Sequence, residues 1–198
     1  MSHYYTDNRN LPHNRREFTF RFSGLSLKFE TDSGVFSKDY VDTGTQILLQ
    51  ALQKQILGDR ILDMGCGYGV IGIVLKKLYD LAEVTMCDIN PRAIECSVSN
   101  AQRNGSNCKI LVSEGFNQLK ETYTTIVCNP PIRAGKAVIY KIFEDSAAYL
   151  ESKGSLWIVM RKQHGAPSAI KKLETLFEEV EIMKKDRGFQ VIRATGSI

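Results

Sequence analysis

The sequence predicts an α/β protein with a seven-stranded, mostly parallel sheet that is covered by helices on both faces. Two observations support this fold class: short apolar segments alternate with segments of helical periodicity, and turn-forming residues separate them. With 198 residues, 43% of them hydrophobic and 24% charged, the composition is that of an ordinary globular domain. Because we find no long apolar run and no signal peptide, we expect a cytoplasmic protein that does not contact membranes.

The first predicted elements precede the alternating region. Residues 1–16 are polar and irregular, so we expect a flexible arm there. In FTFRFSGLSLKF, apolar and polar residues alternate on both sides of a Ser-Gly pair, which predicts a β-hairpin over residues 17–30. Residues 44–57 carry apolar side chains at helical spacing, Ile56 among them, and a glycine ends this predicted helix. Residues 17–198 are expected to form a single domain.

The rest of the chain alternates between strands and helices. Short apolar strands separated by helices indicate a parallel sheet that is buried on both faces. The last two apolar segments are joined by Asp-Arg-Gly, which leaves no room for a helix, so a C-terminal antiparallel hairpin is expected. Trp157 lies inside an apolar segment and is expected in the core. The expected strands are 60–64, 83–88, 108–112, 124–128, 155–161, 179–184 and 189–194, and the expected helices are 70–79, 91–103, 137–151 and 167–177.

Charge and cysteine content narrow the function only slightly. The net charge of +4 is a mild basic bias, which gives weak support to an anionic partner. The five cysteines are odd in number and form no Cys-x-x-Cys pair, which indicates buried thiols in a reducing compartment. The three histidines lie far from any paired cysteines, so we expect no metal. A monomer is expected.

The segment ILDMGCGYGVIG, residues 61–72, contains two overlapping glycine fingerprints. Read from Asp63, it is D-x-G-x-G-x-G and suggests S-adenosylmethionine; read from Gly67, it is G-x-G-x-x-G and suggests a dinucleotide. Both interpretations need an acidic residue after the next strand, and Asp88 can accept hydrogen bonds from ribose hydroxyls in either case. A glycine-rich turn without a ligand is disfavoured, because glycine costs stability unless the backbone needs it.

Asp63 separates the two cofactors. It lies at the end of a predicted strand, where a dinucleotide would place its pyrophosphate, and like charges with little water between them repel each other. S-adenosylmethionine carries a sulfonium and an ammonium group, which a carboxylate attracts. The loop therefore favours S-adenosylmethionine, and its expected contacts are Asp63, Gly65, Cys66, Gly67 and Gly69.

A second motif, IVCNPPIRAGK over residues 126–136, is an apolar strand that ends in Asn129-Pro130-Pro131. Two prolines alone would indicate only a loop after a strand. The exocyclic amine of a base is a poor nucleophile, because its lone pair is delocalised into the ring. The Asn129 oxygen and the Pro130 carbonyl can accept its two N–H groups and direct the lone pair toward a methyl donor. Asn129, Pro130 and Pro131 are therefore the expected catalytic residues, and no strong general base is required.

Together these motifs resemble the small-subunit ribosomal RNA guanine-N2 methyltransferase family (RsmC-like), in a short single-domain form. The matching stretches are GVFSKDYVDTGTQILL (34–49), ILDMGCGYGVIGIVL (61–75), CDINPRAIECSVSNAQRN (87–104), NPPIRAGK (129–136) and WIVMRKQHGAPS (157–168). The resemblance implies the Rossmann-like class I methyltransferase fold, S-adenosylmethionine as cofactor, and ribosomal RNA or the small ribosomal subunit as partner. Further cofactor contacts are expected from Asp42, Thr45, Asp88, Ile89, Glu114 and Asn129, with a helix cap as the alternative role for Asp42.

The residues around the second motif bear on the substrate. Five potential cations follow two of the predicted strands, where they suit an RNA backbone or a solvated basic rim. Ile132 stands where many Asn-Pro-Pro enzymes have an aromatic residue, so adenine-N6 and protein glutamine-N5 methylation stay open beside guanine-N2. A module that binds cofactor and RNA without catalysis is a further alternative, which the intact Asn-Pro-Pro disfavours. The expected substrate contacts are Phe36, Ile132, Arg133, Lys136, Arg161, Lys162 and His164.

Overall fold

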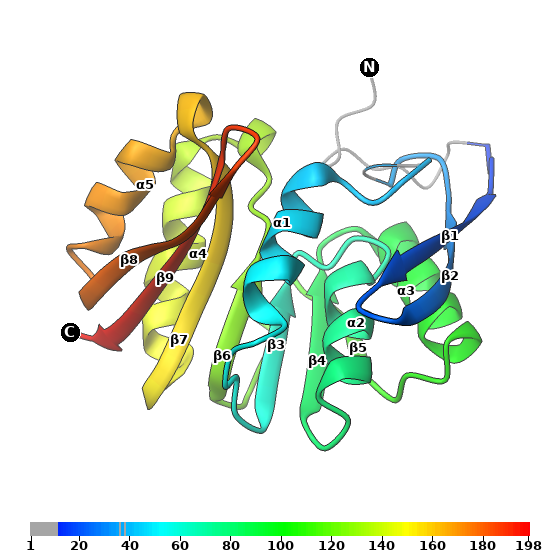
Figure 1. Ribbon diagram of the computed structural model, residues 1–198, viewed down its shortest axis with the longest axis horizontal. Coiled ribbons are helices and arrows are strands. Elements are labelled where there is room, and N and C mark those ends of the chain that lie inside the picture. Colours follow the sequence, from blue (N-terminus) through cyan, green and yellow to red (C-terminus); the bar gives the residue numbers. More distant parts are fainter. Residues whose placement is uncertain (1–11, 36, 38) are drawn as a thin grey trace.

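The computed structural model describes residues 12–35, 37 and 39–198, and Figure 1 shows how their elements are arranged. Each strand and helix expected from the periodicity is present. In chain order the elements are β1 (Arg16–Phe22), β2 (Leu25–Thr31), α1 (Thr43–Leu52), β3 (Arg60–Met64), α2 (Val70–Leu78), β4 (Glu83–Asp88), α3 (Pro91–Arg103), β5 (Lys109–Val112), β6 (Tyr123–Cys128), the 3-10 turn η1 (Ile132–Ala134), α4 (Lys136–Tyr149), β7 (Leu150–Arg161), the 3-10 turn η2 (Lys162–His164), α5 (Ala166–Leu173), β8 (Phe177–Asp186) and β9 (Phe189–Ser197).

The main sheet has seven strands in the order β5-β4-β3-β6-β7-β9-β8. The five strands β3 to β7 form a parallel group, in which each strand is parallel to the strands paired with it. Strand β9, in contrast, is antiparallel to both β7 and β8. The predicted fold class, with an N-terminal hairpin and a C-terminal antiparallel hairpin, is confirmed. The chain runs from β3 outward to β5 and then returns to the other side of β3 at β6. Ligands of open α/β sheets bind at such a reversal, outside the carboxyl ends of the strands.

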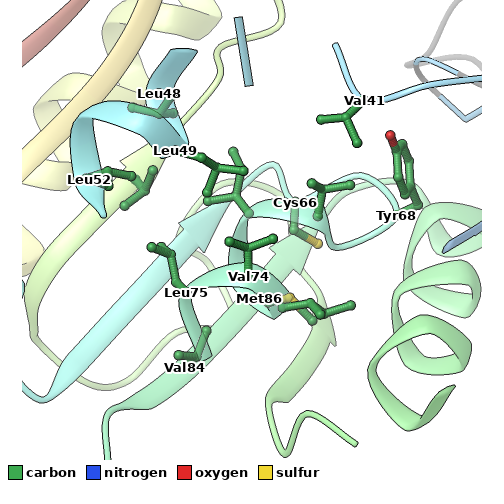
Figure 2. Packing of buried hydrophobic residues seen from close by; sticks show 14 of the residues in the cluster. Val41, Leu48, Leu49, Leu52, Cys66, Tyr68, Val74, Leu75, Val84 and Met86 are labelled. Carbon is green, nitrogen blue, oxygen red and sulfur yellow. The ribbon is translucent and has the colours of Figure 1, made fainter. Parts of the chain in front are cut away.

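Two apolar layers cover the sheet. Figure 1 shows α1 and α2 in front of the sheet and α4 behind it. Figure 2 shows side chains from α1, α2 and β4 meeting in the front layer, among them Leu49, Val74 and Met86. Trp157 packs in the same layer with 2% of its surface exposed, so its predicted place in the core is confirmed. This packing fixes the strand ends from which the polar loops emerge.

Two asparagine side chains attach the N-terminal hairpin to α3. Asn100 donates to the Glu30 carbonyl at 2.8 Å and accepts from the Glu30 amide at 2.7 Å. One helical turn later, Asn104 forms the same pair with Lys28, at 2.7 and 2.9 Å. The two side-chain amides therefore continue the hydrogen-bond ladder along the edge of β2 that faces away from β1. Asn100 also donates to the Tyr68 carbonyl at 2.9 Å, which ties the hairpin to the glycine-rich loop.

The helix expected over residues 44–57 is too long at its C-terminal end. It ends at Leu52, and Ile56, which was expected on its apolar face, is 99% exposed. The Tyr79 hydroxyl lies 2.7 and 2.9 Å from the carbonyl oxygens of Leu52 and Gln55, so a long-range contact satisfies the groups that a longer helix would use.

The helix expected over residues 167–177 is also too long. It covers Ala166–Leu173, because Phe177 pairs with Ser197 at the start of β8 and is buried there. Strand β7 in turn begins earlier than the expected 155–161, at Leu150, directly after α4. Apolar periodicity does not separate adjoining elements that bury the same kind of side chain.

Replacing Asn100 with alanine is expected to lower the free energy of unfolding by about 3 kcal/mol, since three buried backbone groups lose a partner at ~1 kcal/mol or more each. Urea titrations followed by circular dichroism would measure the loss. Asn104→Ala is the matched control, because its contacts with Lys28 are exposed and water can replace them. Equal losses in the two variants would contradict this account of the hairpin attachment.

Candidate active site

Polar side chains from three neighbouring strands gather where the strand order reverses. Asp63 in β3 and Asp88 at the end of β4 are 0% and 2% exposed, and Asn129 directly follows β6. Met64 of β3 is paired with Cys87 of β4 on one side and with a residue of β6 on the other, so the three carboxyl ends are level. The structure thus brings both predicted motifs to one edge of the sheet.

The loop after β3 adopts a backbone conformation that glycine takes most easily. Gly65, Gly67 and Gly69 have φ angles of 72°, 57° and 91°, in the left-handed region. The amides of Gly65 and Cys66 both donate to the Cys87 carbonyl at 2.9 Å, which bends the loop across the end of β4. The glycines of the first fingerprint are therefore explained by the shape of this loop.

Gly72, the last glycine of the second fingerprint, is explained by packing. A Cβ atom at this position would lie 2.3 Å from Sδ of Met86, so only glycine lets α2 lie this close to β4. At Gly65, by contrast, a Cβ atom would meet nothing within 4 Å. The space beside Gly65 is therefore open, as a cofactor bound against this loop would require.

Asp63 caps α2 from the adjoining strand. Its Oδ2 accepts from the amide of Gly72, the third residue of that helix, at 2.8 Å. Its Oδ1 is buried and has no hydrogen-bond partner among the described residues. Burial raises the pKa of Asp63 to about 7, against the effect of the Gly72 bond and with added repulsion from Asp88. A buried, unpartnered carboxylate oxygen fits a cofactor that carries sulfonium and ammonium cations.

Asp88 holds the backbone of the same loop. Its Oδ2 accepts from the Gly67 amide and its Oδ1 from the Asn90 amide, both at 2.9 Å. Asn90 in turn caps α3 by accepting from the Arg92 amide at 3.1 Å. The ribose contact of Asp88 stays a prediction, and its part in shaping the loop is a role that the sequence did not indicate.

Asn129 is oriented by two residues at the start of α1. Its Nδ2 donates to Oδ2 of Asp42 at 3.2 Å and to Oγ1 of Thr45 at 3.0 Å. Asp42 also caps α1 by accepting from the Thr45 amide at 3.2 Å, which is the helix-cap role expected as an alternative to a cofactor contact. With its amide nitrogen directed at α1, Oδ1 of Asn129 accepts no hydrogen bond from the described residues. This arrangement leaves a carbonyl oxygen available to an external N–H donor.

The chain turns sharply after Asn129. Pro130 is buried, and the Pro131 carbonyl accepts from the Ala134 amide at 2.9 Å in η1. Ile132 is 41% exposed at this turn. An exposed aliphatic side chain beside the expected acceptor site offers an apolar contact, without the ring that would stack on a base.

The predicted cations lie at or shortly after the carboxyl ends of two neighbouring parallel strands, β6 and β7. They are exposed, and none of them forms an ion pair with a described residue. The guanidinium carbon of one of them, Arg161, lies 4.4 Å from the centre of the Phe189 ring. The residues are Arg133, Lys136, Arg161, Lys162 and His164.

The remaining predicted residues lie in different surroundings. Cys66 is buried with Sγ 3.6 Å from Oγ of Ser97, and burial raises the pKa of its thiol well above the usual value; its contact with the cofactor stays a prediction. Ile89, 36% exposed, follows β4, and Glu114, which is exposed, follows β5, so both lie at the site's edge of the sheet. Phe36 lies outside the described residues.

Sequence reasoning missed the polar face of α3. Ser97 is fully buried and donates to the Gly67 carbonyl at 2.8 Å, while Asn100 binds the Tyr68 carbonyl of the same loop. Ser97, Asn100 and Asn104 recur at i, i+3 and i+7, which places them on one side of the helix. That spacing of small polar residues is the signal that could have identified them.

In the part of the chain that the structure describes, no three His, Cys, Asp or Glu side chains are grouped to bind a metal ion. None of the described helices is long and apolar enough to cross a membrane.

Asp63→Asn is expected to change how stability depends on pH. Because the pKa of Asp63 rises from 3.8 to about 7 on folding, the folded protein binds this proton more tightly than the unfolded chain. Its contribution therefore favours folding below about pH 4 and is lost as the pH rises toward 7. Asparagine cannot ionise and still accepts from Gly72. Without cofactor, the variant should be more stable than the natural protein at pH 8, by on the order of 4 kcal/mol at ~1.36 kcal/mol per pKa unit.

Chemical denaturation of both proteins at pH 4 and pH 8 measures this difference. The two proteins should be close in stability at pH 4. The same difference at both pH values would contradict a protonated Asp63 in the folded state.

Comparison with known proteins identifies the family. The family model described as "Methyltransferase small domain" matches residues 26–193. The Bacillus subtilis (strain 168) "Uncharacterized protein YbxB" is 44% identical over 195 residues, which is 97% of each chain. The Vibrio vulnificus "Ribosomal RNA small subunit methyltransferase C" is 31% identical over 184 residues, covering 91% of this chain and 53% of that protein.

A solved structure shows the same architecture. The T. thermophilus 16S rRNA N2 G1207 methyltransferase (RsmC), in complex with AdoMet and guanosine, matches with a TM-score of 0.85 and 26% identity, over 94% of this chain and 52% of that one. The chain thus spans about half the length of these ribosomal RNA methyltransferases. The open glycine loop and the unpartnered Asp63 oxygen fit the cofactor of the family. The chain belongs to the methyltransferase small domain family and is an RsmC-like class I methyltransferase that depends on S-adenosylmethionine.

Proposed function

We propose that the protein transfers a methyl group from S-adenosylmethionine to the exocyclic N2 amine of a guanine in ribosomal RNA of the small subunit. The observation that carries the proposal is the orientation of Asn129, whose Nδ2 is bound by Asp42 and Thr45. Similarity to a protein named for N2 methylation of G1207 in 16S rRNA supports the choice of acceptor.

The proposed chemistry needs a carbonyl oxygen at the acceptor nitrogen. S-adenosylmethionine, when bound, supplies an electrophilic methyl group on its sulfonium. Asn129 Oδ1 and the Pro130 carbonyl accept the two N–H groups of the amine and hold its lone pair toward that methyl group. Since Asp42 and Thr45 fix the amide of Asn129, this orientation is in place before the substrate binds, and positioning supplies most of the rate.

Proton removal makes little demand on the protein. The nitrogen becomes cationic as the new N–C bond forms, and it then loses a proton readily to water. Asp42 accepts hydrogen bonds from Asn129 and Thr45, which commits its Oδ2 to positioning. On this proposal, substitutions at the site affect turnover through orientation, not through the loss of a general base.

The RNA partner is supported by the exposed cations after β6 and β7. Five basic side chains without ion-pair partners among the described residues lie at or shortly after the ends of β6 and β7, at the edge of the sheet where Asn129 lies, and such groups attract a phosphate backbone. The protein therefore acts on RNA, with Ile132 providing an apolar contact beside the base.

Transfer of a labelled methyl group tests this function. Small ribosomal subunits from cells that lack the protein would be incubated with the enzyme and labelled S-adenosylmethionine, and the RNA and protein fractions would be counted separately. Label in the RNA, recovered as N2-methylguanosine, is the expected result. Label recovered as N6-methyladenosine would show that the acceptor base is adenine and not guanine. Label in the protein fraction would favour glutamine-N5 methylation and overturn the proposal.

Asn129→Ala is expected to lower turnover on the RNA substrate by ~10²–10³, the effect of removing one preorganised polar group at the reacting centre. Cofactor affinity, measured by calorimetry, should stay nearly unchanged because the side chain addresses the acceptor amine. Asn107→Ala, an exposed asparagine on the loop before β5, is the control and should behave like the natural enzyme. Full turnover in Asn129→Ala would show that the proposed mechanism is wrong.

A further inference from the structure

We propose that Arg161, supported by the ring of Phe189, forms a phosphate-binding site that holds the backbone of the nucleotide presented to Asn129. The inference rests on the proposed function, since it assumes a nucleic acid substrate. It goes beyond a general attraction of RNA to basic residues, because it assigns one cation to one phosphate. Four observations carry it: the position of Arg161, its support, its lack of an acidic partner, and the depth of Asn129.

Arg161 emerges at the same edge of the sheet as Asn129. Cys128, the last residue of β6, is paired in parallel with Ile158 of β7, and β7 ends at Arg161. The two strands are neighbours, so the residues that follow them leave the sheet side by side. A ligand bound at Asn129 would therefore lie at the same edge of the sheet as Arg161.

The guanidinium of Arg161 is supported by an aromatic ring. Its central carbon lies 4.4 Å from the centre of the Phe189 ring, within the range of a cation–π contact, and Phe189 is only 7% exposed. The same ring packs against Gly44, where an added Cβ atom would lie 3.0 Å from Cε1 of Phe189. Gly44 stands between Asp42 and Thr45, the two residues that orient Asn129. One buried ring thus fixes Arg161 relative to the segment that positions the catalytic amide.

No acidic side chain neutralises Arg161 among the described residues. The segments 129–136 and 161–168 contain no Asp or Glu. Arg193, on the partner strand β9, offers a contrast: it lies 5.9 Å from the centre of the Trp157 ring, but it is ion-paired with Glu181. Both arginines contact an aromatic ring between β7 and β9, but Arg193 is paired with a carboxylate, whereas Arg161 has no acidic partner among the described residues and is available to an external anion.

The chemistry of this group selects a phosphodiester. A planar guanidinium donates two parallel hydrogen bonds to a phosphate, and a ring beneath it fixes the plane of the donors. Asn129 is partly buried, so a base reaches it only when it is unstacked and turned out of its helix. A turned-out nucleotide needs its backbone fixed beside Asn129, and Arg161, at the same edge of the sheet, is placed to meet that need.

The test compares Arg161→Ala with Arg193→Ala as the matched control. Arg193 is four ladder positions from Arg161, ~13 Å along the strand, so its removal leaves the surroundings of Arg161 unchanged. RNA binding would be measured by fluorescence anisotropy at several salt concentrations, with the oligonucleotide that the natural enzyme methylates. Arg161→Ala should bind about tenfold more weakly, with a salt slope smaller by about one unit, and calorimetry should show unchanged cofactor affinity.

Two further measurements assign the phosphate. Arg161→Lys keeps the positive charge but loses the planar guanidinium with its two parallel N–H donors. The salt slope should therefore return to the natural value, while the affinity for RNA is only partly restored. Neutral methylphosphonate linkages would then be placed one at a time around the methylated guanine. One linkage should weaken binding by the natural enzyme and have no further effect on Arg161→Ala.

The outcomes separate this inference from the proposed function. If the natural enzyme binds and methylates the RNA and Arg161→Ala matches it in affinity and salt slope, the phosphate site is wrong and the function stands. The phosphate site is also wrong if every methylphosphonate weakens both proteins equally. If the natural enzyme neither binds nor methylates RNA, the proposed function fails, and the phosphate site fails with it.

Discussion

The architecture depends on a glycine loop that must cross the end of the sheet without side chains, and on the two buried carboxylates that hold it there. Asp63 binds the backbone of α2 behind the loop, and Asp88 binds the amide of Gly67 within it. Both carboxylates come from the ends of neighbouring parallel strands, so the sheet itself sets their separation. Burial raises the pKa of Asp63, and repulsion from Asp88 adds to the effect. The Oδ1 atom of Asp63, which has no partner among the described residues, is suited to a cationic ligand.

The surroundings of Asn129, the proposed acceptor side of the site, are built from a different part of the chain. Asp42 caps α1 and also accepts a hydrogen bond from the amide of Asn129, so one carboxylate fixes a helix terminus and the Asn129 side chain together. The N-terminal hairpin supports the cofactor side in a similar way: Phe18 and Phe29 contact the Tyr68 ring edge to face, and Asn100 binds the backbone of the same residue. Cofactor loop and acceptor site are thus each held by contacts from outside their own motif.

Much of the fold, and the place of both motifs within it, was predictable from the sequence. Strand and helix periodicity located each element, and the two motifs lie at strand ends, so a parallel sheet had to bring Asp63 and Asn129 to one edge. Helix ends were less predictable, because α1 ends where the hydroxyl of Tyr79, a residue at the C-terminal end of α2, binds the carbonyl groups of Leu52 and Gln55. The hydrogen bond between Asn129 and Asp42 joins residues 87 positions apart, and no local pattern indicates such a pair.

The central claim is that Asn129 acts through an orientation that α1 imposes. A double-mutant cycle tests it directly, by comparing turnover at saturating cofactor in Thr45→Val, Asn129→Ala and the combined variant. Valine keeps the shape of Thr45 and removes the oxygen that receives Nδ2 of Asn129. If Thr45 works through Asn129, the combined variant turns over at the rate of Asn129→Ala alone. If the two losses instead multiply, Thr45 and Asn129 act independently, and the orientation of the amide is not what the site depends on.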